Sequence, residues 1–516
     1  MKNLIFTWGL LFSTFAFGNL IPLTEHQANA FTKYTSNDGL VSYMKALEKA
    51  YPKNFKLGTF GESINGIKLQ YALVGDEVLT PEEAKKQGKL IAVIDANIHG
   101  DERTYREAVL TFMAQVVTPG TDMNALLKDV YFIFTPSLNP DGFMAKPEAT
   151  RRNAHGVDMN RDYMKLEEPE LKSFVQNILQ KWNPHLWIDG HNGGAYPYNV
   201  LYMAASHIEV NPQIRIFTED VIFKKIDEKL KSNGHKSFFY QRADKKNKYW
   251  KVGGHFTRIG RNFGGLSNIM TILLESANWQ DKKLGYESAL ESLHAVFNSV
   301  ADNVFKIKKI IANAKKETRI LKDLKPQAAV RMKYKFNDET YKYLIAPSRN
   351  KKGKEISYID RIINSVKNGK VKMKSVATLK RDIPSFYLIH QDNEIALDVL
   401  KAQNIKMIEL KKEKTVSAIR YLVEKFHHKK IYNHPAAVVV DSLVEEKVNL
   451  TIGKGYFLIP TDQDLGRLAF QLLEPEASDS LLFWNKFDSI VPKNTEEGLI
   501  YPVLKIMDDI ELISRF

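Results

Sequence analysis

The chain has 516 residues, of which 44% are hydrophobic and 26% charged, so it is long enough to fold into two or three domains. Its net charge is +14, but the lysines lie in short scattered clusters without a nucleic-acid-binding motif. We therefore predict solvated basic faces and no nucleic-acid partner. The chain contains no cysteine, which excludes disulfides and leaves histidine and carboxylate side chains as candidate metal ligands.

The first 18 residues have the pattern of a signal peptide. Lys2 supplies a positive start, an apolar run covers 4–15, and Ala16 and Gly18 are small residues suited to cleavage. The alternative is a membrane anchor, but the run is shorter than the roughly 20 apolar residues that span a bilayer. We expect export to a periplasmic or secreted location, without stable membrane insertion after cleavage.

Hydrophobic spacing then predicts alternating strands and helices. A helical pattern within 31–51 precedes a strand pair in 56–74 around the turn at Asn65-Gly66. Short apolar runs predict four buried strands, and helical spacing predicts helices between them. The strands are expected at 90–98, 130–136, 185–189 and 269–274, and the helices at 104–117, 170–182 and 214–230.

This alternation predicts an α/β fold with a mixed, mostly parallel twisted sheet flanked by helices. In such sheets, ligands bind beyond the carboxyl ends of the strands. His99 follows the first apolar run, His191 follows the third, and Glu275 ends the fourth. We therefore expect these three side chains to meet at one edge of the sheet.

The rest of the chain is predicted to be a separate region. A long helical pattern at 288–316 ends the first domain, which we assign to 19–316, and a linker is expected at 317–332. The remainder, 333–516, is predicted to be a smaller α/β or β-rich accessory domain. It holds strand-like runs at 341–346, 436–440 and 456–459, and a helical pattern at 416–426 followed by the solvated pair His427 and His428.

The sequence His99-Gly100-Asp101-Glu102 lies where a buried strand is predicted to turn into a helix. A hydrolytic zinc site needs three protein ligands and one open position, and two histidines with a carboxylate are a known solution. His-x-x-Glu alone is common in surface pairs, so the motif needs support from elsewhere in the chain.

That support comes from four further motifs in order along the chain. They are Asn139-Pro140-Asp141-Gly142, Arg151-Arg152-Asn153 with Gly156-Val157-Asp158-Met159-Asn160-Arg161, Asp189-Gly190-His191-Asn192, and Leu273-Leu274-Glu275-Ser276. Together with the first motif, they resemble the zinc carboxypeptidase family over about 31–305. The resemblance implies a carboxypeptidase-like fold for the first domain.

The resemblance also implies roles for individual residues. It makes His99, Glu102 and His191 the ligands of one zinc ion, and Asp158 the acid that hydrogen-bonds a ligand histidine. Glu275 would be the general base, which agrees with the cost of burying an unpaired carboxylate in an apolar strand.

The same resemblance assigns residues to the substrate. Arg151, with Arg152 as the alternative, would polarise the scissile carbonyl, and Asn160 with Arg161 would bind the terminal carboxylate. The family also closes a tyrosine over its substrate, for which Tyr240 and Tyr249 are candidates. The stretch 258–266 is expected to line the pocket of the last side chain, where a lone arginine would favour acidic residues.

The sequence thus predicts an exported zinc metallocarboxypeptidase acting on the C-terminal bonds of peptides or of peptidoglycan stem peptides. The alternative is a zinc amidase or deacylase acting on N-acyl amino acids or murein peptides. A binding module that lost catalysis is the third possibility, and it is disfavoured because the three ligands and Glu275 are all present. The pair Asn160-Arg161 favours a peptide with a free carboxylate over the deacylase.

Overall fold

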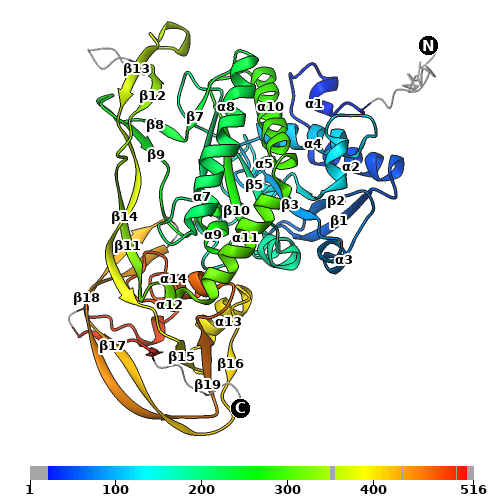
Figure 1. Ribbon diagram of the computed structural model, residues 1–516. Helices are drawn as coiled ribbons and strands as arrows, with labels where there is room; N and C mark the ends of the chain where they lie inside the picture. Colours follow the sequence, from blue (N-terminus) through cyan, green and yellow to red (C-terminus); the bar gives the residue numbers. More distant parts are fainter. Residues whose placement is uncertain (1–20, 349–354, 433, 496, 508–516) are drawn as a thin grey trace, which may run out of the picture.

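The computed structural model describes residues 21–348, 355–432, 434–495 and 497–507, and the predicted signal peptide at 1–18 lies outside these ranges. Within them, no helix has both the length and the apolar character needed to cross a membrane. The centre of the first domain is an eight-stranded sheet (Figure 1). Its strands, in spatial order, are β1 (Phe55–Glu62), β2 (Lys68–Val74), β4 (Val130–Thr135), β3 (Leu90–Ala96), β5 (Leu186–Asn192), β10 (Met270–Ser276), β6 (Val200–Ala204) and β7 (Ser237–Phe239).

The sheet is mixed and mostly parallel, as the sequence predicts. The pairs β4–β3, β3–β5, β5–β10 and β6–β7 are parallel, and the pairs β1–β2, β2–β4 and β10–β6 are antiparallel. Every residue of β3, β4 and β10 is buried. These strands read as unbroken apolar runs because helices or other chain segments cover both of their faces.

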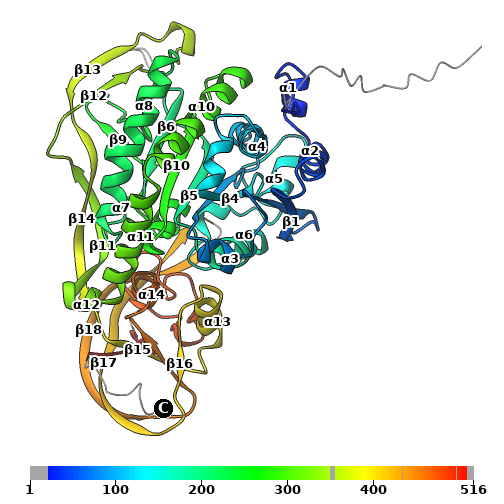
Figure 2. The same cartoon turned by 45° about the vertical axis from the view of Figure 1, so that its right-hand side comes forward.

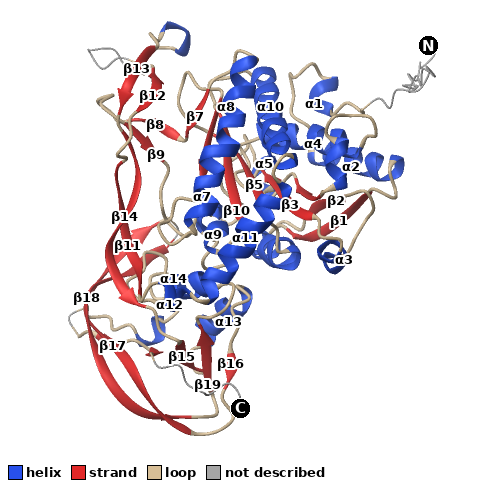
Figure 3. Ribbon diagram, in the orientation of Figure 1, coloured by secondary structure: helices blue, strands red, loops and turns tan. Residues whose placement is uncertain are grey.

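Helices pack against both faces of this sheet (Figure 3). The helices between residues 21 and 324 are α1 (Glu25–Ala28), α2 (Asn37–Ala50), α3 (Pro81–Lys86), α4 (Thr104–Val117), η1 (Asn124–Lys128), α5 (Pro140–Met144), η2 (Met159–Arg161), α6 (Pro169–Phe174), η3 (Val175–Gln180), α7 (Pro212–Phe217), η4 (Thr218–Ile222), α8 (Phe223–Ser232), α9 (Gly260–Leu266), α10 (Lys282–Ala301), α11 (Val304–Arg319) and α12 (Leu321–Leu324). The core on one face joins α2, α4, α8, α10 and α11 to the sheet, whereas α6 and η3 pack on the other face.

The C-terminal region is β-rich. It comprises β11 (Gln327–Phe336), β12 (Tyr341–Ile345), η5 (Tyr358–Asp360), β13 (Asn364–Gly369), β14 (Val371–Asp382), β15 (Phe386–His390), α13 (Glu394–Ala402), β16 (Ile408–Glu409), β17 (Lys414–Ile431), β18 (His434–Ile452), β19 (Tyr456–Pro460), α14 (Gly466–Leu473), η6 (Asp488–Ile490), β20 (Leu499–Ile500) and β21 (Val503–Ile506). Its largest sheet has the order β16-β19-β15-β21-β17-β18, with β20 paired to β17. The sequence 317–332, expected as a linker, lies in the end of α11, in α12 and in the first part of β11.

This region is continuous with the first domain. The ribbon of β11 and β14 runs alongside it, and β14 pairs with β9 (Trp250–Val252), which in turn pairs with β8 (Gln241–Ala243) (Figure 1). One hydrophobic core contains Val93 and Trp187 of the central sheet together with Tyr387 and Trp484 of the C-terminal region. On one face of the central sheet, accessory residues therefore share a core with α6 and η3.

The helix predicted at 416–426 is wrong, because this segment forms the middle of β17. The structure pairs β17 with β18 in a register running from Lys414↔Ile452 to Ile431↔His434. A register shift between Val423 and Phe426 interrupts the alternation of buried residues and produces spacing that resembles a helix. His427 is accordingly on a strand, where its Nδ1 lies 2.8 Å from Asp441 Oδ2.

Candidate active site

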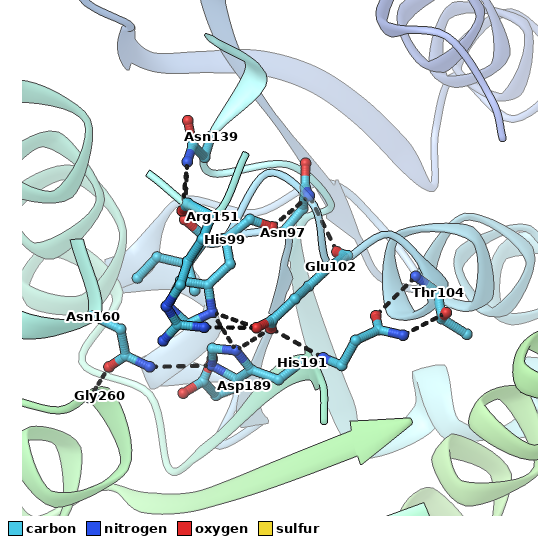
Figure 4. Close-up of polar contacts among 12 residues, drawn as sticks. Asn97, His99, Glu102, Thr104, Asn139, Arg151, Asn160, Asp189, His191 and Gly260 are labelled. Atoms are coloured by element: carbon cyan, nitrogen blue, oxygen red, sulfur yellow. Dashed lines mark hydrogen bonds and ion pairs between the residues drawn. The ribbon is translucent and has the colours of Figure 1, made fainter. Parts of the chain in front are cut away.

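The side chains of His99, Glu102 and His191 converge at the carboxyl ends of β3 and β5 (Figure 4). His99 Nδ1 lies 2.9 Å from Glu102 Oε1, and His191 Nδ1 lies 2.7 Å from Glu102 Oε2. The two Nδ1 atoms are 3.1 Å apart. Two imidazole nitrogens and a carboxylate aimed at one buried point form a donor set that suits zinc.

Each histidine has a second carboxylate close to its other ring nitrogen. His99 Nε2 lies 3.0 Å from Asp158 Oδ1, and His191 Nε2 lies 2.8 Å from Asp189 Oδ1. Such contacts fix the ring so that Nδ1 faces the metal position, and they raise the basicity of the ligand. The role predicted for Asp158 therefore agrees with its contact.

The electrostatics of this group favour its charged forms. Although burial opposes ionisation of Glu102, His99 and His191 hold the pKa of its carboxyl well below its usual range. Burial opposes ionisation of Asp158 as well, but its neighbours, His99 first and then Arg161 and Arg151, lower the pKa of that carboxyl. Both carboxylates are thus ready to accept bonds from cations or N–H groups.

The loop that carries His99 and Glu102 is shaped by Asn97. Asn97 has a φ of 60°, and its side-chain amide donates to the carbonyls of His99, Gly100 and Glu102 at 2.9, 3.1 and 3.1 Å. A Cβ atom at Gly100 would lie 2.2 Å from the backbone carbon of Gly142. The close approach of these two loops therefore requires glycine at position 100.

Glu275 lies on β10 directly opposite His191 of β5 in the parallel register. Its side chain is buried, and its Oε2 has no hydrogen-bond partner among the described residues. Burial raises the pKa of Glu275 to about 8, with Glu102 adding to the shift and His191 opposing it. Gly193 leaves space for this carboxylate, because a Cβ there would lie 2.6 Å from Oε2.

Arg151 lies next to the group of His99, Glu102 and His191 (Figure 4). Its Nη1 donates to Glu102 Oε1 at 2.9 Å and its Nε donates to Asp158 Oδ2 at 3.0 Å. The side chain of Arg151 is 40% exposed, so it can also reach a ligand. Arg152, the alternative from the sequence, instead donates to the carbonyl of Gly156 at 2.6 Å.

Asn160 and Arg161 lie in the short helix η2, beside His191. The amide oxygen of Asn160 accepts from the backbone N–H of Gly260 at 2.9 Å, and its Nδ2 lies 3.3 Å from His191 Nε2. Arg161 donates from Nη1 to the carbonyl of Asn160 at 2.6 Å. The predicted substrate pair therefore lies within the same cluster as the metal group.

The two tyrosine candidates occupy different places. The Tyr240 ring lies 3.5 Å from the Cβ position of Gly193, next to Glu275, and burial together with Glu275 and Glu102 raises the pKa of its hydroxyl. Tyr249 instead contacts Phe336 edge-on, with ring centroids 5.0 Å apart. Tyr240 is the candidate that faces the cluster.

The stretch 258–266, expected to line the side-chain pocket with a lone arginine, contains two buried arginines, Arg258 and Arg261, and Nη2 of Arg261 donates to the carbonyl of Gly254. Arg258 is buried, and its Nε lies 2.8 Å from Asp479 Oδ1 of the C-terminal region. Its charge is therefore balanced within the protein.

Two residues of the cluster received no role from the sequence. Asp189 stands two positions before His191 on β5, and side chains two apart share a face of a strand, so the alternation could have identified it. Asn97 acts through a left-handed backbone conformation and a loop geometry that no periodicity reveals.

Comparisons with known proteins match part of the chain to a family. Residues 40–252 match the family model described as zinc carboxypeptidase. Carboxypeptidase 2 of Trichophyton rubrum is 22% identical over 466 residues, covering 86% of this chain and 81% of that protein. Carboxypeptidase SOL1 of Arabidopsis thaliana is 31% identical over 28% of this chain and 30% of its own length.

A solved metallo-carboxypeptidase from Burkholderia cenocepacia is 17% identical, covers 52% of this chain and 70% of that chain, and has a TM-score of 0.41. At that score it adds nothing to the assignment, which rests on the family match and the curated carboxypeptidases. The family uses one zinc ion, and the buried group of His99, Glu102 and His191 could hold it. Residues 40–252 therefore form a zinc carboxypeptidase domain, and the chain that carries it is a zinc-dependent peptide hydrolase.

Proposed function

We propose that this enzyme is an exported carboxypeptidase that removes C-terminal residues from peptides, including the stem peptides of peptidoglycan. The observation that carries the proposal is the convergence of Glu275, Arg151, Asn160 and Arg161 on the group of His99, Glu102 and His191. A site with a metal, a base and a fixed carboxylate binder is what exopeptidase cleavage requires.

In this proposal His99, Glu102 and His191 hold the zinc ion, with Asp158 and Asp189 orienting the two imidazoles. When bound, zinc supplies a Lewis acid for the scissile carbonyl and lowers the pKa of a coordinated water to about 7.

Glu275 acts as the general base. Its Oε2 accepts the proton of the attacking water and then passes that proton to the nitrogen of the leaving amine as the peptide bond breaks. The absence of a hydrogen-bond partner for Oε2 among the described residues supports this role, because the oxygen is available to water.

Arg151 stabilises the negative charge that develops on the carbonyl oxygen. Its partial exposure and its position against Glu102 support this assignment. Asn160 and Arg161 bind the terminal carboxylate of the substrate, and Tyr240 closes over it.

Export rests on the signal-peptide pattern at 1–18. A net charge of +14 suits work on an anionic cell envelope, which supports stem peptides among the substrates.

Matched peptides with free and amidated C termini test the proposal. We expect mass spectrometry to show loss of single residues from the free peptide and none from the amide, because the amide lacks the charge that Arg161 binds. Arg161→Met should lower kcat/KM for the free peptide by roughly 100-fold, the value of a charge-assisted bidentate contact. Hydrolysis of N-acyl amino acids without peptide trimming would establish the deacylase instead.

A further inference from the structure

Tyr432, at the tip of the β17–β18 hairpin, lies against the residue proposed to bind the substrate carboxylate. The guanidinium carbon of Arg161 lies 5.2 Å from the centre of the Tyr432 ring, within the range of a cation–π contact. The hairpin belongs to the C-terminal region and curves from it toward the first domain (Figure 2). An accessory residue therefore reaches the edge of the active site.

The hairpin tip is held in place by Glu167, which follows the η2 segment of the active site. His434 Nε2, at the start of β18, lies 3.0 Å from Glu167 Oε2, and Lys486 of the same region contacts Glu167 Oε1. Lys165 Nζ completes the cluster at 2.6 Å from Glu167 Oε2. The tip is thus tied to the chain segment that carries Arg161.

A second group of contacts surrounds Arg258, which also lies near Tyr432. The guanidinium carbon of Arg258 lies 5.7 Å from the centre of the Tyr432 ring, 5.3 Å from that of Phe483 and 5.2 Å from that of Trp484. Asp479 neutralises this buried arginine at 2.8 Å. Tyr432 therefore lies near two guanidinium groups, one buried and paired, and one next to the cluster.

The backbone of Tyr432 also indicates a constrained position. Its φ is 48°, in the left-handed region that bulky residues rarely adopt, although the side chain is 44% exposed. Such conformations persist where surrounding contacts fix them, and they are frequent at functional sites.

We propose that Tyr432 is a positioning residue for substrate recognition, which holds the guanidinium of Arg161 toward the terminal carboxylate of the peptide. The accessory region thereby completes the carboxylate-binding subsite of the enzyme. This inference rests on the proposed function of Arg161.

The geometry of Arg161 supports this role. A guanidinium has five N–H donors in one plane, and Nη1 of Arg161 donates to the carbonyl of Asn160, while Nη2 is 3.8 Å from Asp158 Oδ2. An aromatic ring covers a face of the guanidinium without using its N–H donors. The remaining N–H donors at the edge of the guanidinium can then bind a carboxylate. The side chain of Arg161 is 22% exposed, so a substrate can reach it.

The test compares Tyr432→Ala and Tyr432→Phe in the full-length zinc-loaded enzyme, with a C-terminal peptide as substrate. Tyr432→Ala should raise KM about 5- to 10-fold at unchanged kcat, because uniform binding of the carboxylate is weakened. Tyr432→Phe should keep KM within about 2-fold of the wild type, because the ring is retained. His427→Gln, a substitution of an exposed residue on the same hairpin, is the matched control and should leave both constants unchanged.

Thermal melting of each variant separates loss of folding from loss of positioning. A Tyr432→Ala enzyme with wild-type KM, or a Tyr432→Phe enzyme as impaired as the alanine variant, would overturn the inference. A wild-type enzyme that trims free and amidated peptides equally well would instead refute the proposed role of Arg161, on which the inference depends.

Discussion

At the scale of single residues, the site depends on carboxylates that orient its histidines. Asp158 and Asp189 contact the Nε2 atoms of His99 and His191 from different segments of the chain. The two rings therefore present the same nitrogen, Nδ1, to the metal position. The motif around Asp158 predicts its role. The motif that contains Asp189 predicts only that His191 is a metal ligand, and it assigns no role to Asp189.

Asp189→Asn tests this orientation without relying on activity. We expect the zinc affinity to fall about 10- to 100-fold, because the amide cannot stabilise the ligand ring as a carboxylate does. Competition with a chromophoric chelator measures the affinity, and Asp158→Asn should have an effect of similar size. Wild-type zinc affinity in Asp189→Asn would remove Asp189 from the site.

The raised pKa of Glu219 predicts that the stability of the fold depends on pH, independently of catalysis. Burial raises the pKa of Glu219 from 4.5 to about 7, while Arg215 partly opposes the shift. The folded carboxyl thus holds its proton more tightly than the unfolded one. The contribution of this carboxyl to the free energy of unfolding is fully present below about pH 4.5 and is lost as the pH rises to about 7.

Glu219→Gln removes this titration. The variant should match the wild type near pH 4 and exceed it at pH 8 by about 2 kcal/mol in free energy of unfolding. Urea denaturation at both pH values measures the difference. A constant difference across the pH range would contradict the assigned cause.

At the scale of elements, the strands that carry the site and the short accessory strands β12 and β19 were predictable, whereas the long strand β17 was not. The apolar runs at 90–98 and 130–136 form β3 and β4, and the helix expected at 104–117 is α4 with the same bounds. Both faces of β3 and β4 are buried, so their sequences alone identify them. The segment 416–426 depends on pairing with β18, a distant partner that local spacing does not contain.

The close packing of β5 against α4 and β3 fixes the position of His191. A Cβ atom at Gly190 would lie 2.7 Å from Tyr105 Cβ on α4 and 3.0 Å from the carbonyl oxygen of Asp95 on β3. These are backbone and near-backbone obstacles, which cannot rotate away. The close approach of α4 to the sheet therefore requires glycine at this position.

Gly190→Ala should displace β5 and with it the ligand His191. We expect the free energy of unfolding of the metal-free protein to fall by about 1 to 3 kcal/mol, the usual cost of overpacking. Zinc affinity should fall as well. Denaturation curves without zinc, followed by a zinc titration, measure both effects; a variant with unchanged stability would show that β5 can shift freely.

At the scale of the whole molecule, the two regions form one structure around the site. The core that covers one face of the central sheet includes accessory residues such as Tyr387 and Trp484, and β14 extends the pair β8–β9. Sequence patterns indicated a β-rich accessory region but not its position. The reason is physical: the contacts of Arg258 with Asp479 and of Glu167 with His434 join residues more than 200 positions apart.

The central claim is that Glu275 and one zinc ion perform peptide hydrolysis together. It is tested most directly by measuring zinc content and kcat for the wild type and Glu275→Gln, with Glu219→Gln as a remote control. We predict about one zinc per chain in all three proteins, wild-type turnover in the control, and a kcat lowered by about 1000-fold in Glu275→Gln. Normal turnover by zinc-loaded Glu275→Gln would contradict the account.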